Sequence, residues 1–237
     1  MTTSAPVEDL DTPAAPAPPS TRLRTALLAV IGVALLVLGG AGAVALGLGR
    51  QAPPSASSVD AGFSWDMSRH HTQGVQMADL VATHSSDPVI RSLGFDIAHT
   101  QLDQVGRMQG WLSLWDLPVT DPNAPMAWMG GMPAHDMGGM AGMSGAMAQG
   151  ALMPGMATEA ELDHLASLSG SAFDVEFLRL MIRHHEGGLD MAQYGAAHAQ
   201  LAPVRQLAQS IAQTQTAEVQ TMLQLLTARG GTPLPAP

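Results

Sequence analysis

The stretch FDVEFLRLMIRHHEGGLDMAQ, residues 173–193, decides the fold because the chain carries a second version of it. The earlier version, DAGFSWDMSRHHTQGVQMA, occupies residues 60–78, and pairing residue n with residue n + 114 aligns the two without a gap. Across residues 60–84 and 174–198, 11 of 25 positions are identical. An internal duplication predicts two similar structural units that pack on each other and share a core.

Each unit reads as a helical hairpin. Asp87-Pro88 is typical of an N-cap followed by proline in the first helical turn. The helix that follows has apolar residues at three-and-four spacing, and the same offset relates it to the end of the chain through Arg91/Arg205, Leu93/Leu207, Ile97/Ile211, Gln101/Gln215, Val105/Val219 and Met108/Met222. Two hairpins with one long connection predict an all-α fold, a four-helix bundle over residues 60–229.

Two further start signals lie between the hairpins. Thr158 and Glu161 have the spacing of a capping box, which predicts a short helix there. Ser171 and Asp174 predict a similar start for the third bundle helix.

The composition limits the chemistry. The chain has no Cys, 16 Met, nine His and a formal net charge of −10. A net acidic chain repels nucleic-acid phosphates, so no nucleic-acid partner is expected, and a cation suits it better. Without thiolates, any soft metal must be bound by Met or His.

The N-terminal region predicts a membrane anchor. We expect residues 1–25 to be a disordered cytoplasmic tail, residues 26–48 an uncharged transmembrane span of roughly 35 Å, and residues 49–59 a linker. Arginines before the span place the bundle outside the cytoplasm of a single-pass cell-membrane protein. The alternative is a signal peptide cleaved near Ala43-Val44-Ala45, which would give a secreted protein, but its apolar region exceeds the usual ~7–15 residues.

Residues 121–157 lack apolar periodicity and are rich in Met, Gly, Pro and Ala, which predicts a flexible insertion in the bundle. Residues 230–237 read as a loose tail. Several thioethers within a few residues of one another are typical of copper capture, although an apolar insertion without function would have the same composition. The candidate ligands here are Met126, Met129, Met132, His135, Met137, Met140 and Met143.

The duplicated helix carries the second group of candidate ligands. On a helical wheel, His184, Met191 and His198 form one stripe, with His185 and Gly188 beside it, and the first copy repeats the pattern. The candidates are Met67, His70, His71, Met77, His84, Met181, His184, His185, Met191 and His198. Imidazole and thioether donors suit copper, with Cu(I) favoured over Cu(II). Because glycine costs ~1 kcal/mol in a helix, its recurrence at 74 and 188 predicts a close approach by a helix or an ion.

Taken singly, these residues also have plain structural explanations. Met at helical spacing is usually core, and a single His usually makes a structural hydrogen bond. A metal-independent cell-envelope interaction or sensory module is therefore the alternative function. A di-iron enzyme is disfavoured because only one Glu-x-x-His motif, Glu161 to His164, occurs in the sequence. The remaining acids read as solvated helix faces: Asp79, Asp96, Asp103, Glu176, Glu186, Asp190 and Glu218.

The motifs FSWDMSRHHTQGVQMA and FDVEFLRLMIRHHEGGLDMA resemble the signature of the domain of unknown function 305 family. The pattern of residues 97–108, the stretch ATEAELDHLASLSGSAFD and the pair Trp111 and Trp115 are also similar to the family. The resemblance covers about residues 60–229 and implies a ferritin-like four-helix bundle. It also implies, through the CopM-like members, periplasmic copper binding in copper resistance. We therefore expect an extracytoplasmic, non-enzymatic copper sequestration protein or chaperone with an unidentified copper-transport partner.

Overall fold

The computed structural model describes residues 21–48, 52–130 and 152–235, and all regular secondary structure within them is helical. This confirms the predicted all-α fold. The elements are α1 (Thr21–Ala45), α2 (Val59–His84), α3 (Pro88–Leu114), the 3₁₀ turn η1 (Ala127–Met129), α4 (Glu159–Ser167), α5 (Gly170–His198) and α6 (Ala202–Ala228). The predicted tail before residue 21 and most of the Met-rich insertion lie outside the described residues.

The chain divides into two compact units, residues 1–52 and residues 53–237. In the first, α1 begins at Thr21, a few residues before the uncharged stretch, and buries none of its residues. It is long and apolar enough to cross a membrane, a property that membrane anchors and signal sequences share. The second unit contains all the other helices.

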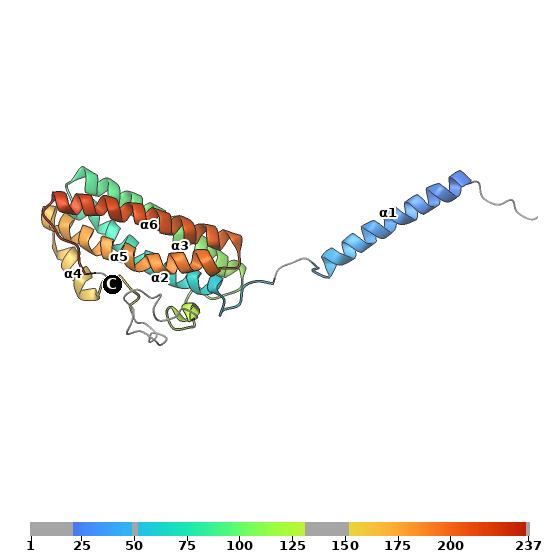
Figure 1. Ribbon diagram of the computed structural model, residues 1–237, viewed down its shortest axis with the longest axis horizontal. Helices are drawn as coiled ribbons and strands as arrows, with labels where there is room; N and C mark the ends of the chain where they lie inside the picture. Colours follow the sequence, from blue (N-terminus) through green and yellow to red (C-terminus); the bar gives the residue numbers. More distant parts are fainter. Residues whose placement is uncertain (1–20, 49–51, 131–151, 236–237) are drawn as a thin grey trace, which may run out of the picture. The chain divides into compact units, whose positions relative to one another are not determined.

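The second unit is a four-helix bundle in which the α2–α3 hairpin packs against the α5–α6 hairpin through α2 and α5 (Figure 1). The duplicated helices run antiparallel: His84 at the end of α2 stacks on Phe173 near the start of α5, with ring centroids 5.2 Å apart. At the other end, Asp60 near the start of α2 accepts hydrogen bonds from the backbone N–H groups of Gln200 and Leu201, just beyond α5. The sequence duplication therefore becomes an approximate two-fold symmetry in space.

Two of the predicted helix starts are observed and one is not. Asp87 caps Val89 N–H ahead of Pro88, and Thr158 and Glu161 form a capping box at α4. The start predicted from Ser171 and Asp174 is wrong, because α5 already begins at Gly170. Asp174 is the fifth residue of α5, and its side chain is buried.

Antiparallel packing gives the bundle two apolar clusters that mix the two copies. Phe63 and Met67 of α2 join Met191 of α5 in one cluster, which also takes in Met129 and Met153 from the connection. Met77 of α2 joins Phe173, Phe177 and Met181 of α5 in the other. The consecutive histidines lie between these clusters on both helices.

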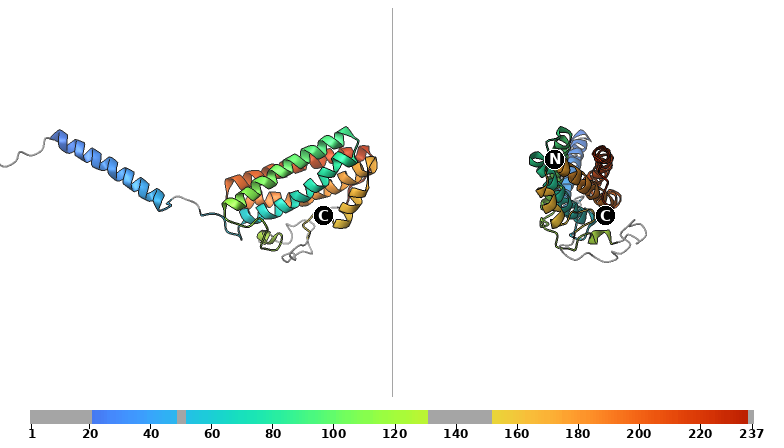
Figure 2. Two further views of the ribbon diagram at one scale, coloured as in Figure 1. Left: turned by 180° about the vertical axis from the view of Figure 1, so that it is seen from behind. Right: turned by 90° about the vertical axis from the view of Figure 1, so that its left-hand side faces the viewer.

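Two described parts of the connection between the hairpins pack on the bundle: η1 contacts α2, and α4 contacts α2 and α5 (Figure 2). At its start, the Asp66 carboxylate accepts hydrogen bonds from Met126 N–H and Trp128 Nε1–H, both 2.7 Å long. At its end, residues 152–157 form what we call the strap. The Gln73 amide donates to Ala157 O and accepts from Ala157 N–H, which fixes the strap to α2.

Candidate metal centre

Four histidine side chains meet in the middle of the bundle. His70 and His71 of α2 and His184 and His185 of α5 are all 0% exposed. The rings of His70 and His184 lie face to face across the two copies, with centroids 3.9 Å apart and an interplanar angle of 32°. Within each consecutive pair the ring centroids are 6.3 Å apart for His70 and His71 and 6.0 Å apart for His184 and His185.

The hydrogen bonds of the inner two histidines assign their tautomer. His70 Nε2 lies 3.1 Å from the Pro154 carbonyl oxygen in the strap, and His184 Nε2 lies 2.9 Å from the His70 carbonyl oxygen. A carbonyl oxygen only accepts, so in both rings Nε2 carries the proton and donates. In a neutral ring the proton on Nε2 leaves Nδ1 with a lone pair.

The outer two histidines follow the same rule with side-chain acceptors. His71 Nε2 donates to Gln104 Oε1 over 2.8 Å, and His185 Nε2 donates to Glu218 Oε2 over 2.7 Å. The expectation that Glu218 lies on a solvated helix face is therefore wrong, because its carboxylate accepts a hydrogen bond from the buried His185 ring. Gln104 and Glu218 are equivalent under the duplication, which is the signal that would have connected them to the histidines.

The four Nδ1 atoms are the unusual feature of the centre, because all of them are buried and none has a hydrogen-bond partner. Burial lowers the pKa of His70 to about 4 and of His71 to about 3, and it lowers the pKa of His184 well below its ordinary value. These three rings are therefore neutral at pH 7, and each points a buried lone pair at no protein donor. Buried polar atoms of this kind call for a ligand or for ordered water.

Two glycines and two glutamines complete the centre, again in equivalent positions. A Cβ atom on Gly74 would stand 2.1 Å from Gln101 Oε1 and 3.0 Å from His184 Cε1. A Cβ atom on Gly188 would stand 3.1 Å from both Gln215 Oε1 and His70 Cε1. The close approach expected at both glycines is thus found, and it is made by a histidine of the other copy and a glutamine. Both amide ends of each glutamine are buried without a partner.

The methionine candidates flank the histidines and lie at two levels of the bundle. Met67, Met129 and Met191 are buried in one apolar cluster, with Met126 packed against it, and Met77 and Met181 are buried in the other. These methionine side chains pack in the two apolar clusters on either side of the histidines.

The two outlying histidines do not reach the centre. His84 hydrogen-bonds the carbonyl oxygens of Leu80 and Ala166, and His198 is exposed and stacks beside Tyr194 with ring centroids 4.2 Å apart. Each lies 13 residues or more along its helix from the central pair, roughly 20 Å at 1.5 Å per residue. The candidates Met132, His135, Met137, Met140 and Met143 lie outside the described residues.

No group of three or more His, Asp or Glu side chains within residues 21–48, 52–130 and 152–235 has the arrangement of a metal site. The four histidines therefore do not form a four-ligand arrangement like that of structural zinc sites.

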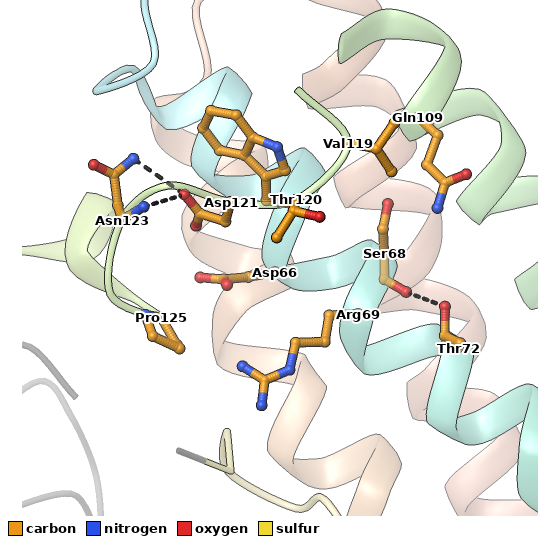
Figure 3. Close-up of a pocket in the computed structure, with 11 residues that line it drawn as sticks. Asp66, Ser68, Arg69, Thr72, Gln109, Val119, Thr120, Asp121, Asn123 and Pro125 are labelled. Atoms are coloured by element: carbon orange, nitrogen blue, oxygen red, sulfur yellow. Dashed lines mark hydrogen bonds between the residues drawn. The ribbon is translucent and has the colours of Figure 1, made fainter. Parts of the chain in front are cut away.

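A separate groove runs along the outer face of α2, and none of the four histidines lines it (Figure 3). Its lining includes Trp65, Asp66, Ser68, Arg69 and Asp121. Burial raises the pKa of Asp66 to about 6, against the lowering effect of its bonds to Met126 and Trp128. Sequence reasoning missed Asp66, because nothing in the pattern of α2 marks it as the anchor of the connection.

Comparisons with known proteins agree with this architecture. The model of the family described as domain of unknown function (DUF305) matches residues 60–226. A solved DUF305 protein of Streptomyces coelicolor, described as secreted, is 38% identical with a TM-score of 0.66, and the match covers 76% of this chain and 99% of that one. A DUF305 fragment from Deinococcus radiodurans is 29% identical with a TM-score of 0.56, covering 74% and 99%.

The same fold is found in CopM in its Cu(I)-bound form, which is 23% identical with a TM-score of 0.53 and is matched over 73% of this chain and 98% of that one. Among curated proteins, no sequence matches the chain.

Proposed function

The chain belongs to the DUF305 family, and we propose that it binds copper as Cu(I) through its two pairs of consecutive histidines. The observation that carries the proposal is the set of four buried Nδ1 atoms without partners, in rings whose Nε2–H groups are all engaged. A hydrogen bond at the far nitrogen is how proteins orient an imidazole and fix the lone pair that binds a metal.

The spacing of the rings supports one ion in each pair. Two opposed imidazole nitrogens that bind one ion at about 2.0–2.1 Å place the ring centres roughly 6 Å apart. The pairs His70–His71 and His184–His185 have centroids 6.3 Å and 6.0 Å apart. These centroid separations are compatible with one two-coordinate ion in each pair, which also requires the two Nδ1 atoms of the pair to face each other.

The chemistry of the surroundings favours a soft monovalent ion. Neutral imidazoles without a thiolate, enclosed by thioether side chains, suit Cu(I) better than a hard divalent ion, which needs more donors and charged oxygens. Solved structures of CopM with Cu(I), Cu(II) and silver share the fold and are consistent with metal binding here. With α1 as an anchor or signal, the bundle would hold copper outside the cytoplasm and either store it or pass it to a partner.

The alternative is a metal-independent interaction module in which the histidines serve only as structural donors. Their four Nε2–H bonds favour it, since each ring is already fixed by the protein. The two functions differ at Nδ1, which a structural role leaves unused.

The experiment follows from that difference. The full-length chain is purified in detergent and titrated with Ag(I), which does not change oxidation state, and retained silver is counted after desalting. Nitrogen-15 NMR of labelled histidine reports which ring nitrogen is bound. We expect two ions per chain and a shift of Nδ1. In His71→Gln and His185→Gln the amide nitrogen keeps a donor near the Nε2 position, and each variant should retain one ion.

Replacing the exposed His99 with Gln is the matched control and should leave two ions bound. A wild-type chain that retains no silver at sub-micromolar free ion would leave the metal-independent module as the better account. Two ions retained after both His71→Gln and His185→Gln would move the site away from the histidines.

A further inference from the structure

The histidines, glycines and glutamines 101 and 215 of the two pairs are identical under the duplication, but the side-chain partner of the outer histidine differs. His71 donates to the neutral amide of Gln104, whereas His185 donates to the carboxylate of Glu218. Both contacts have similar lengths, 2.8 Å and 2.7 Å, so the difference is one of charge and not of geometry.

This difference matters because the centre is buried. A monovalent cation between His70 and His71 has two neutral rings as ligands, and the outer ring donates to a neutral amide. A cation between His184 and His185 lies one ring away from a carboxylate that compensates its charge. An uncompensated charge in a protein interior is strongly unfavourable, and a paired one is much less so.

Glu218 lies at the edge of the buried centre and is only partly buried. Its side chain is 22% exposed, while the His185 ring that it contacts is completely buried. It borders a narrow opening between α3 and α6, together with His71 and Gln104. The carboxylate therefore keeps part of its hydration on the outside and acts on the ring on the inside.

We propose that Glu218, acting through its hydrogen bond to His185, makes His184–His185 the tighter of two unequal monovalent-metal sites, with His70–His71 as the weaker one. The inference rests on the proposed function and specifies how its two sites differ. A carboxylate that accepts the far N–H of a ligating imidazole raises the basicity of the ligand, and losing such a partner typically lowers metal affinity about 10–100-fold. Glu218 is a positioning and charge-compensating residue, since it touches the ring and not the ion.

The test exchanges the two partners while both histidine pairs stay intact. Four full-length chains in detergent are titrated with Ag(I) against a competing chelator: wild type, Glu218→Gln, Gln104→Glu and the double exchange. Nitrogen-15 NMR of the histidines records which pair fills first. We expect wild type to bind in two steps about 10–100-fold apart, with His184 and His185 first.

Glu218→Gln should bring the tighter step down to the weaker one, and the double exchange should reverse the order of filling. A merely structural role for Glu218 does not predict that reversal. Gln104→Glu introduces a carboxylate at a buried position, so circular dichroism checks whether this variant folds. If Gln104→Glu does not fold, the affinities of Glu218→Gln alone decide whether Glu218 makes the two sites unequal. A wild-type chain without bound silver would overturn both proposals. Two equal sites, or a difference that persists in Glu218→Gln, would overturn this inference alone.

Discussion

The contact between the strap and α5 gives a sharp prediction for Gly187→Ala. A Cβ atom on Gly187 would stand 2.2 Å from Pro154 O, 2.4 Å from Pro154 C and 2.5 Å from Gly155 N. All three are backbone atoms, so no side-chain rotation can make room. Gly155 has a φ of +78°, which only glycine adopts without strain, so the strap cannot easily refold around the methyl group. The strap must therefore move away from α5.

The size of the destabilisation follows from the hydrogen bond that the strap accepts from His70. Moving Pro154 removes the acceptor of His70 Nε2–H and leaves that donor buried, which costs about 1–3 kcal/mol. Alanine returns up to ~1 kcal/mol as the better helix former. We expect a net loss of roughly 1–2 kcal/mol and, for a domain of this size, a fall of about 2–8 °C in Tm.

The measurement is thermal unfolding of wild type and variant by circular dichroism. Gly106→Ala is the matched control, because Gly106 lies exposed on α3 and a Cβ atom there meets nothing within 4 Å. The same chemical change should raise Tm by about 2–4 °C at that position. If Gly187→Ala were as stable as Gly106→Ala, the close packing of the strap on α5 and the role of Pro154 as acceptor would both be refuted.

Three further outcomes are expected. The three buried histidines with a lowered pKa stay neutral in the folded state but bind protons in the unfolded state. The metal-free protein should therefore lose stability as the pH falls from about 6.5 to 4, by up to ~1.4 kcal/mol per pH unit for each ring. Urea unfolding at several pH values measures this loss. Asp66 makes the opposite contribution to the pH dependence of stability, because with a raised pKa of about 6 the folded state takes up the proton before the unfolded state does. Asp66→Asn removes this contribution, so the loss of stability between pH 6 and pH 4 should be steeper in the variant. Glu161→Gln removes the charge and one of the two acceptors that Glu161 of α4 offers to Arg183 of α5, a pairing that lowers the Glu161 pKa to about 2. The substitution should cost about 1 kcal/mol of stability at pH 7, since this pair is partly exposed and screened, as measured by urea unfolding. No change in stability would mean that α4 is held by its apolar residues alone.

The fold was readable from the sequence because its signals are local and repeated. A proline and an acidic cap at 87–88, a capping box at 158–161 and three-and-four apolar spacing each determine a helix without reference to the rest of the chain. The start predicted from Ser171 failed because any Ser three residues before an acid imitates a cap. The position at which α5 begins is marked instead by Gly170, whose φ of +59° favours glycine.

Only part of the site could be predicted from the sequence, for a physical reason. Repetition and helical spacing identify the histidines, since both depend on the sequence alone. The partners of those histidines come from α3, α6 and the strap, and helix packing decides which of their residues meet a ring. Glu218 shows the difficulty: on α6 alone it is one more acid on a polar face, and only its contact with His185 distinguishes it from Asp190. Pro154 carried no signal because its contribution is a backbone carbonyl.

The approximate symmetry of the bundle is broken at the two places where the histidines meet the rest of the chain. On the inner side, His184 donates to a carbonyl of α2, while His70 donates to the strap and not to the corresponding carbonyl of α5. On the outer side, a glutamine in one half stands where a glutamate stands in the other. A duplication that served only to double capacity would gain nothing from either difference. If the two pairs bind ions with unequal affinity as proposed, one beside a carboxylate and one beneath the strap, the bundle would keep one ion and exchange the other.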